Sequence, residues 1–305
     1  MAINPETASL NRSAAFASIA VATLLLGLKA WAAWSTGSTA MLGSLADTAL
    51  DLIASLATLA GVWVAAQPDD SEHRFGHGKA EALAAMLQVV LISISALSLA
   101  FRAAGQLLAG ARTEAAGEGI AVSGIAMAAT LGLLVWQRHV IARTRSLAIS
   151  TDHVHYQSDL LLNLAVIAAL ALDQYVGIKG ADPLFGLAIA AWLGWGAWNA
   201  SHEAIDNLMD KEWPQERKDR FIAVLGRHPE LRGVHDLRTR TSGNRDFVQF
   251  HVWVDGRMSV IDAHKIMDEI EAKLLAEFPG IEILIHPDPE GHVDTGLAAE
   301  AVIAP

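Results

Sequence analysis

Two aspartates, Asp47 and Asp51, lie in an apolar stretch at residues 43–66 that is long enough to cross a bilayer. An ionisable side chain at membrane depth is costly and usually faces a polar pathway. Spacing i, i+4 places both carboxylates on one face of a helix. Because two neighbouring like charges repel, this face favours bound protons or a bound cation. The alternative is a structural role, with both carboxylates satisfied by a neighbouring helix.

Composition indicates a membrane part joined to a soluble part. Of the 305 residues, 52% are hydrophobic and 18% are charged, which suits neither a soluble domain nor an all-membrane protein. The net charge of -11 argues against a nucleic-acid partner. Because the chain has no cysteine, a metal would be bound by imidazole and carboxylate groups. Such ligands favour zinc, iron, manganese or cadmium over Cu(I).

Apolar runs of spanning length predict six membrane helices. They cover residues 13–34, 40–66, 80–109, 119–141, 147–175 and 183–208. The first run is too long for the apolar region of a signal peptide. Lys29 lies toward the end of that run, where a long side chain can extend to the interface. Basic residues gather in alternate connections, which by the positive-inside rule predicts cytoplasmic N- and C-termini and an inner-membrane protein.

After residue 208 the pattern becomes that of a soluble domain. We expect a helix at 213–228, strands at 234–243 and 245–256, a helix at 259–278 with Ser259 as its N-cap, and a strand at 281–288. The predicted fold class is therefore membrane α-helical, with six transmembrane helices followed by a cytoplasmic α-β-β-α-β domain. The predicted domains are residues 1–208 (transmembrane), 209–292 (cytoplasmic, metal-binding) and 293–305 (a disordered tail).

A second i, i+4 pair lies in the fifth predicted helix. His155 and Asp159 share one face there, and Asn163 extends the same stripe. Together with Asp47 and Asp51 they provide three carboxylates and one imidazole, a tetrahedral ligand set that zinc accepts. The alternative is a hydrogen-bonded cluster that only holds two helices together.

Two further groups of residues have metal-ligand chemistry. In the loop after the second helix, Asp70, His73 and His77 offer three ligands within eight residues, although a solvated acidic loop would look the same. In the soluble domain, His286 and Asp288 are two positions apart, so they share one face of a predicted strand. The candidate ligands of that domain are His235, His251, His264, His286 and Asp288. Taken singly, each of its histidines is more often a surface residue.

Several segments resemble signatures of the cation diffusion facilitator (CDF) family, in its bacterial zinc and ferrous-iron efflux branch. They are LADTALDLIASL, FGHGKAEALAA, HYQSDLLLN, HDLRTRTSG and ILIHPDP, spread over most of the chain. The resemblance implies a Y-shaped homodimer of six-helix protomers with ferredoxin-like, metallochaperone-like cytoplasmic domains.

The resemblance also assigns roles to the candidate residues. It implies a transport site at Asp47, Asp51, His155 and Asp159, a loop site at Asp70, His73 and His77, and a binuclear cytoplasmic site at His235, His251, His264, His286 and Asp288. It further implies a salt bridge near the dimer's membrane surface, between Lys79 and Asp210. His153 departs from the family pattern, because relatives usually carry an apolar residue there.

The expected activity is export of a divalent metal ion, Zn2+ with Cd2+ or Fe2+ as alternative ions, in exchange for protons. Metal binding requires deprotonated ligands, so we expect His155 and Asp51 to couple metal transport to the counterflow of protons. An intramembrane zinc metalloenzyme is disfavoured, because four protein ligands leave no position for a reactive water and no HExxH helix occurs. A membrane metal sensor is disfavoured by the lack of an output module after residue 292, so no enzyme activity or signalling role is expected.

Overall fold

The computed structural model describes residues 5–36, 39–109, 120–172, 181–227, 232–243 and 245–291. The chain divides into two compact units at residues 205 and 206. The predicted tail at 293–305 lies outside the described residues.

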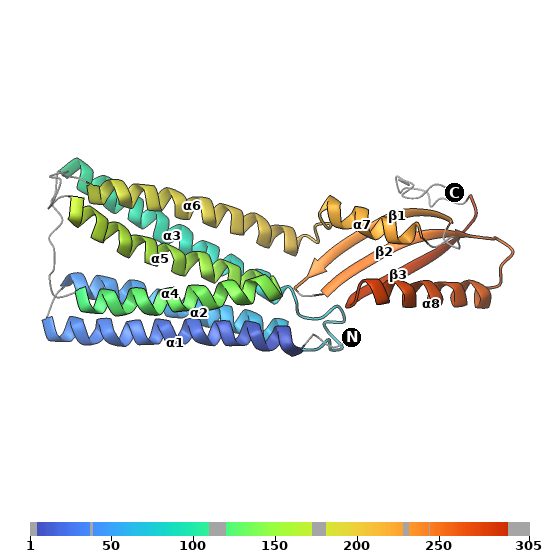
Figure 1. Ribbon diagram of the computed structural model, residues 1–305, viewed down its shortest axis with the longest axis horizontal. Helices are drawn as coiled ribbons and strands as arrows, with labels where there is room; N and C mark the ends of the chain where they lie inside the picture. The colour runs from blue at the N-terminus through green and yellow to red at the C-terminus, as the bar shows by residue number, and fades with distance from the viewer. Residues whose placement is uncertain are drawn as a thin grey trace. The chain divides into compact units, whose positions relative to one another are not determined.

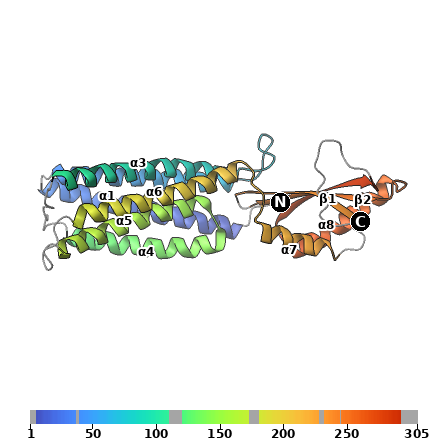
Figure 2. The ribbon, with the colours of Figure 1, turned by 90° about the horizontal axis from the view of Figure 1, so that it is seen from above.

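The N-terminal unit is a bundle of long helices that run side by side (Figures 1 and 2). They are α1 (Pro5–Thr36), α2 (Thr39–Ala65), α3 (Ala80–Ala109), α4 (Ile120–Thr144), α5 (Leu147–Ala171) and α6 (Ala181–Leu208). Among the described residues, four segments are long and apolar enough to cross a membrane, and these lie in α1 to α4. The helices begin and end close to the predicted runs.

Small residues let the helices of this bundle approach closely. Gly61 of α2 lies against α3, where an added Cβ would be 2.4 Å from the Ala84 Cβ and 3.0 Å from the Ala80 carbonyl oxygen. Ala14 of α1 and Ala148 of α5 are fully buried in the same cluster. Close approach through small residues is the usual way in which membrane helices associate.

The C-terminal unit contains two helices and a three-stranded sheet in the predicted order. Its elements are α7 (Gln215–Leu225), β1 (Arg232–Ser242), β2 (Arg245–Val254), α8 (Val260–Glu277) and β3 (Ile281–Pro289). The strand order is β1-β2-β3, with β1 antiparallel and β3 parallel to the central β2. A parallel pair needs a crossover connection, which α8 provides.

One hydrophobic core holds this unit together. Phe221 of α7, Phe250 of β2 and Leu274 of α8 are completely buried within it. Alternation along β2 directs Val248, Phe250 and Val252 into this core. Ser259 caps α8 as predicted, because its side chain accepts a hydrogen bond from the Asp262 N–H at 3.2 Å.

Candidate metal centres

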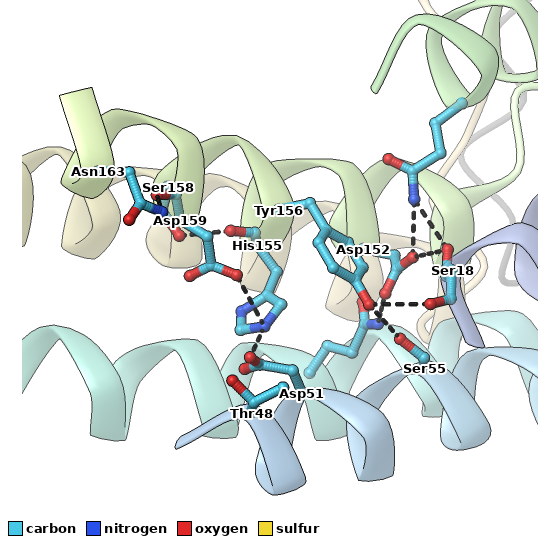
Figure 3. A network of polar contacts seen from close by, with 12 residues as sticks. Ser18, Thr48, Asp51, Ser55, Asp152, His155, Tyr156, Ser158, Asp159 and Asn163 are labelled. Atoms are coloured by element: carbon cyan, nitrogen blue, oxygen red, sulfur yellow. Dashed lines mark hydrogen bonds and ion pairs between the residues drawn. The ribbon is translucent and has the colours of Figure 1, made fainter. Parts of the chain in front are cut away.

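The fifth helix places His155 and Asp159 against Asp51 of α2 (Figure 3). The His155 Nε2 atom is 2.9 Å from the Asp51 Oδ1 atom and 3.9 Å from the Asp159 Oδ2 atom. One ligand atom from each of the three residues lies within 4.8 Å of the others. His155 is only 6% exposed, so the imidazole has little contact with solvent.

These separations suit a tetrahedral metal ion. Nitrogen and oxygen ligands bind zinc at about 2.0–2.2 Å, which places neighbouring ligand atoms about 3.3 Å apart. The two distances from His155 lie on either side of that value. Small side-chain movements would therefore bring all three ligands to bonding distance of one ion.

Asp47, the fourth expected ligand, is not part of this close group of described residues. It lies on α2 and is exposed. Four residues of helix separate it from Asp51 by about 6 Å along the axis, so His155 reaches only the nearer carboxylate. His153 also lies apart from the group, because its Nδ1 atom is 3.2 Å from the Gln137 Oε1 atom.

Between the two aspartates, Thr48 receives a hydrogen bond from α1. The Lys29 ammonium donates to the Thr48 Oγ1 atom at 2.6 Å. The Lys29 side chain thus joins α1 to the part of α2 that carries Asp47 and Asp51. That it extends to the membrane interface stays a prediction.

Sequence analysis missed Asp152, a carboxylate on α5 that is 0% exposed. Its Oδ2 atom accepts hydrogen bonds from the Ser18 hydroxyl of α1 at 2.6 Å and the Gln137 amide of α4 at 2.8 Å. Its Oδ1 atom accepts from the Gln88 amide of α3 at 2.9 Å. The one available signal was the spacing of three residues to His155, which places both on one helix face.

Tyr156 adds a second link beside this network (Figure 3). Its hydroxyl donates to the Ser18 carbonyl oxygen at 3.2 Å and lies 2.9 Å from the Ser55 hydroxyl of α2. The polar side chains of α5 therefore form two neighbouring clusters, one of metal-ligand type and one of hydrogen-bonding type.

The loop between α2 and α3 brings its three candidate ligands together. Asp70 is 3.2 Å from the His73 Nδ1 atom and 3.4 Å from the His77 Nε2 atom. Hydrogen bonds from the backbone N–H groups of His73, at 2.7 Å, and Glu72, at 2.9 Å, hold the pKa of the Asp70 carboxyl below its ordinary value. This carboxylate therefore stays ionised to a lower pH than an ordinary aspartate does.

Sheet register places three histidines of the C-terminal unit in a row. His235 of β1 pairs with His251 of β2, which pairs with His286 of β3. The buried Asp288 carboxylate lies between them, with its Oδ2 atom 2.8 Å from the His251 Nδ1 atom and 3.3 Å from the His235 Nε2 atom. Its Oδ1 atom is 3.2 Å from the His286 Nε2 atom. One oxygen of the Asp288 carboxylate thus faces two imidazoles, and the other oxygen faces the third.

The surroundings of this centre differ from the predicted ligand set at two residues. His264 of α8 is largely exposed and lies 3.6 Å from Asp268 of its own helix. Asp236, which the sequence reading missed, has its Oδ2 atom 3.7 Å from the His251 Nε2 atom. It lies at a bulge of β1 with a positive φ of 48°, and the bulge turns its side chain toward the centre.

The expected partners Lys79 and Asp210 fall in different units of the chain. Asp210 forms an ion pair with Arg240 of β1 at 3.3 Å. The salt bridge between Lys79 and Asp210 stays a prediction.

Comparison with known proteins assigns both units to one family. The family profile of the cation efflux transmembrane domain matches residues 15–209, and that of the cation efflux protein cytoplasmic domain, ZT_dimer, matches residues 213–290. The chain belongs to the cation efflux family. It is a membrane transporter of the cation diffusion facilitator type, as its sequence motifs predicted, and its C-terminal unit is the cytoplasmic domain of that family.

Curated relatives match this cation efflux protein along nearly all of its length. The cation-efflux pump FieF of Serratia proteamaculans is 42% identical over 294 residues, which are 96% of this chain and 98% of that protein. FieF of Klebsiella pneumoniae is 40% identical over 291 residues, which are 95% of this chain and 97% of that protein.

Two solved structures each match little more than a quarter of this transporter. The metal-bound C-terminal domain of the CzcD transporter from Thermotoga maritima is 34% identical, with 27% of this chain and 100% of that chain covered and a TM-score of 0.25. The Zn form of the putative zinc transporter CzrB is 39% identical. The match covers 28% of this chain and 98% of that chain, with a TM-score of 0.27. These TM-scores are too low for a structural argument.

Proposed function

We propose that this cation efflux transporter exports Zn2+ from the bacterial cytoplasm in exchange for protons, by alternating access of one site to the two sides of the inner membrane. The observation that carries the proposal is the grouping of Asp51, His155 and Asp159 inside the helical unit. An imidazole and two carboxylates are costly at membrane depth unless they serve a cation or a proton. In the proposed topology, α1 to α6 all span the membrane and both termini are cytoplasmic.

The ligand chemistry supports zinc as the transported ion. A site with one imidazole and several carboxylates suits Zn2+ and also admits Cd2+ or Fe2+, whereas a manganese site would be richer in oxygen ligands. In the metal-bound state, Asp47 would complete the set by a rotation of its side chain toward Asp51. The Asp47 side chain is exposed and thus free to turn.

Competition for the same ligand atoms supports exchange with protons. A metal ion binds the deprotonated carboxylates and the neutral imidazole, so binding displaces the protons that those groups carry. The contact of 2.9 Å between the His155 Nε2 and the Asp51 Oδ1 atoms is the hydrogen bond that a proton shared by this pair would form. Loss of the metal to the outside would then restore that proton, and a proton gradient would drive efflux.

The other two centres would serve delivery and regulation. Asp70, His73 and His77 would hold a metal ion in the loop, at the cytoplasmic surface. The Asp288 carboxylate, with one oxygen toward His235 and His251 and the other toward His286, could bridge two ions. His264 would join such a binuclear site only after moving away from Asp268. Metal binding there would draw together the cytoplasmic domains of a homodimer, which Lys79 and Asp210 would help to lock.

Uptake into proteoliposomes under an imposed pH gradient tests this function. We expect the purified protein to move zinc and cadmium faster than manganese, and the Asp51→Ala variant to move none of them above the rate of empty vesicles. A rate for Asp51→Ala equal to that of the unaltered protein would refute the site. Metal binding without any transport would instead favour a membrane metal sensor.

A further inference from the structure

We propose that Asp152 is a positioning residue of the transport site, because its carboxylate fixes the rotation of α5 and thereby the direction in which His155 and Asp159 face Asp51. The inference rests on the proposed function, in which those three residues bind the transported ion. It concerns a residue that would not itself touch the metal.

Asp152 receives hydrogen bonds from three other helices. The Ser18 hydroxyl of α1, the Gln88 amide of α3 and the Gln137 amide of α4 all donate to its carboxylate, at 2.6, 2.9 and 2.8 Å. The Gln88 amide also donates to the Thr58 hydroxyl of α2 at 2.5 Å. The Asp152 side chain of α5 is thus linked directly to α1, α3 and α4, and through Gln88 to α2.

The direction of these hydrogen bonds requires a carboxylate at this position. The Gln137 Oε1 atom lies 3.2 Å from the His153 Nδ1 atom, so its amide turns its NH2 group toward Asp152. Among the described residues, the Gln88 Oε1 atom has no hydrogen-bond partner, so Gln88 is held only through its donor end. An ionised carboxylate only accepts hydrogen bonds and can satisfy all three donors. An asparagine would point an NH2 group at another donor.

Rotation of α5 matters because Asp152 lies on the face that carries the ligands. His155 and Asp159 follow it by three and seven residues, which leaves all three within about 60° of one another around the helix. A rotation of only about 10° would move a side-chain atom some 6 Å from the helix axis by roughly 1 Å. Metal–ligand distances tolerate about 0.2 Å. A group that holds this rotation therefore controls the fit of the site.

Cobalt binding can separate positioning from simple stabilisation of the bundle. Co2+ replaces zinc in tetrahedral sites and absorbs visible light according to its coordination. The difference between the cobalt spectra of the unaltered full-length protein and of its Asp51→Ala variant gives the absorption of the transport site alone, without that of the other centres. The same titration is then carried out for Asp152→Asn and for the double variant Asp152→Asn with Gln137→Glu. The matched control is Thr151→Val. Thr151 is 1% exposed, and among the described residues its hydroxyl donates only to the Leu147 carbonyl oxygen of its own helix.

We expect Asp152→Asn to weaken cobalt and zinc binding at the transport site by about 10- to 100-fold, the usual effect of losing a group that orients a metal ligand. The cobalt spectrum should also change in shape. Gln137→Glu gives the asparagine an acceptor and should restore affinity to within a few-fold. Gln88→Met, which removes one donor without changing charge, should weaken binding in the same direction. Thr151→Val should bind as the unaltered protein does.

Two results would overturn the inference alone. Asp152→Asn could bind cobalt with unchanged affinity and spectrum while unfolding at a lower temperature, which would make the network purely structural. Alternatively, Asp152→Asn could weaken binding while Gln88→Met has no effect. Because Gln137→Glu restores a carboxylate beside position 152, rescue by the double variant would then make the negative charge, and not the hydrogen bonds, the cause. If Asp51→Ala left the cobalt signal unchanged, the proposed function itself would fail, and this inference with it.

Discussion

Replacing Gly61 with alanine should force α2 and α3 apart. The new Cβ would lie 2.4 Å from the Ala84 Cβ and 3.0 Å from the Ala80 carbonyl oxygen. Non-bonded carbon atoms rest at about 3.5–4.0 Å, so the two helices would have to separate locally by about 1.1–1.6 Å. Both atoms, a Cβ and a backbone carbonyl oxygen, move only with the backbone, so no flexible side chain can relieve the contact.

Overpacking of this kind costs about 1–3 kcal/mol. For a unit of about 200 residues, each kcal/mol lowers the unfolding midpoint by about 2–4 °C, so we expect a decrease of about 2–12 °C. Tryptophan fluorescence of the purified full-length protein during heating would measure it.

Gly132 of α4 provides the matched control, because an added Cβ there meets no atom within 4 Å. Gly132→Ala should leave the midpoint unchanged or raise it slightly, since alanine favours the helix. If Gly61→Ala unfolded at the same temperature as Gly132→Ala, the close packing of α2 on α3 would be wrong.

Three other predictions concern the loop and the cytoplasmic domain. Because the His73 N–H lowers the pKa of Asp70, the turn it stabilises should persist as pH falls to the ordinary aspartate value of 3.8 and be lost only below it, which hydrogen exchange of the loop amides would measure. Asp288→Asn should weaken zinc binding by the cytoplasmic domain at least about 10-fold, because this carboxylate faces three imidazoles. Zinc titration of the full-length protein, with Asp51→Ala present to remove binding at the transport site, would measure the change. Ser259→Ala should destabilise the cytoplasmic domain by about 1 kcal/mol, because the Asp262 N–H loses its cap, as measured by chemical unfolding.

Each of these has a clear contrary result. Loss of amide protection well above pH 3.8 would show that the loop turn does not depend on the ionised Asp70 carboxylate. Unchanged zinc affinity in Asp288→Asn would remove the bridging carboxylate from the cytoplasmic centre. An unfolding free energy unaffected by Ser259→Ala would mean that the cap contributes nothing.

Local patterns predicted the elements of the fold well. The apolar runs located six long helices, and the motif at Ser259 located the start of α8, because both signals depend only on neighbouring residues. The i, i+4 spacing of His155 and Asp159 placed them on one helix face for the same reason. It could not tell which of the two aspartates of α2 would lie level with His155, since that depends on how far one helix is shifted along the other.

Contacts between distant segments were beyond such patterns. The network around Asp152 is built from Ser18, Gln88 and Gln137, single polar residues on three helices with no common spacing. The row of histidines in the sheet depends on strand register, which a bulge in β1 shifts near His235. Asp236 faces the cytoplasmic centre only because of that bulge, so alternation along the strand could not have placed it there.

Simultaneous recording of zinc and proton flux in the same proteoliposomes tests the central claim most directly. With an indicator for each ion inside the vesicles, the unaltered protein should move zinc and protons in opposite directions, and each flux should depend on the other. Both fluxes should disappear together in Asp51→Ala, because one set of ligand atoms serves both ions. Zinc movement that continues without any counterflow of protons would contradict the account.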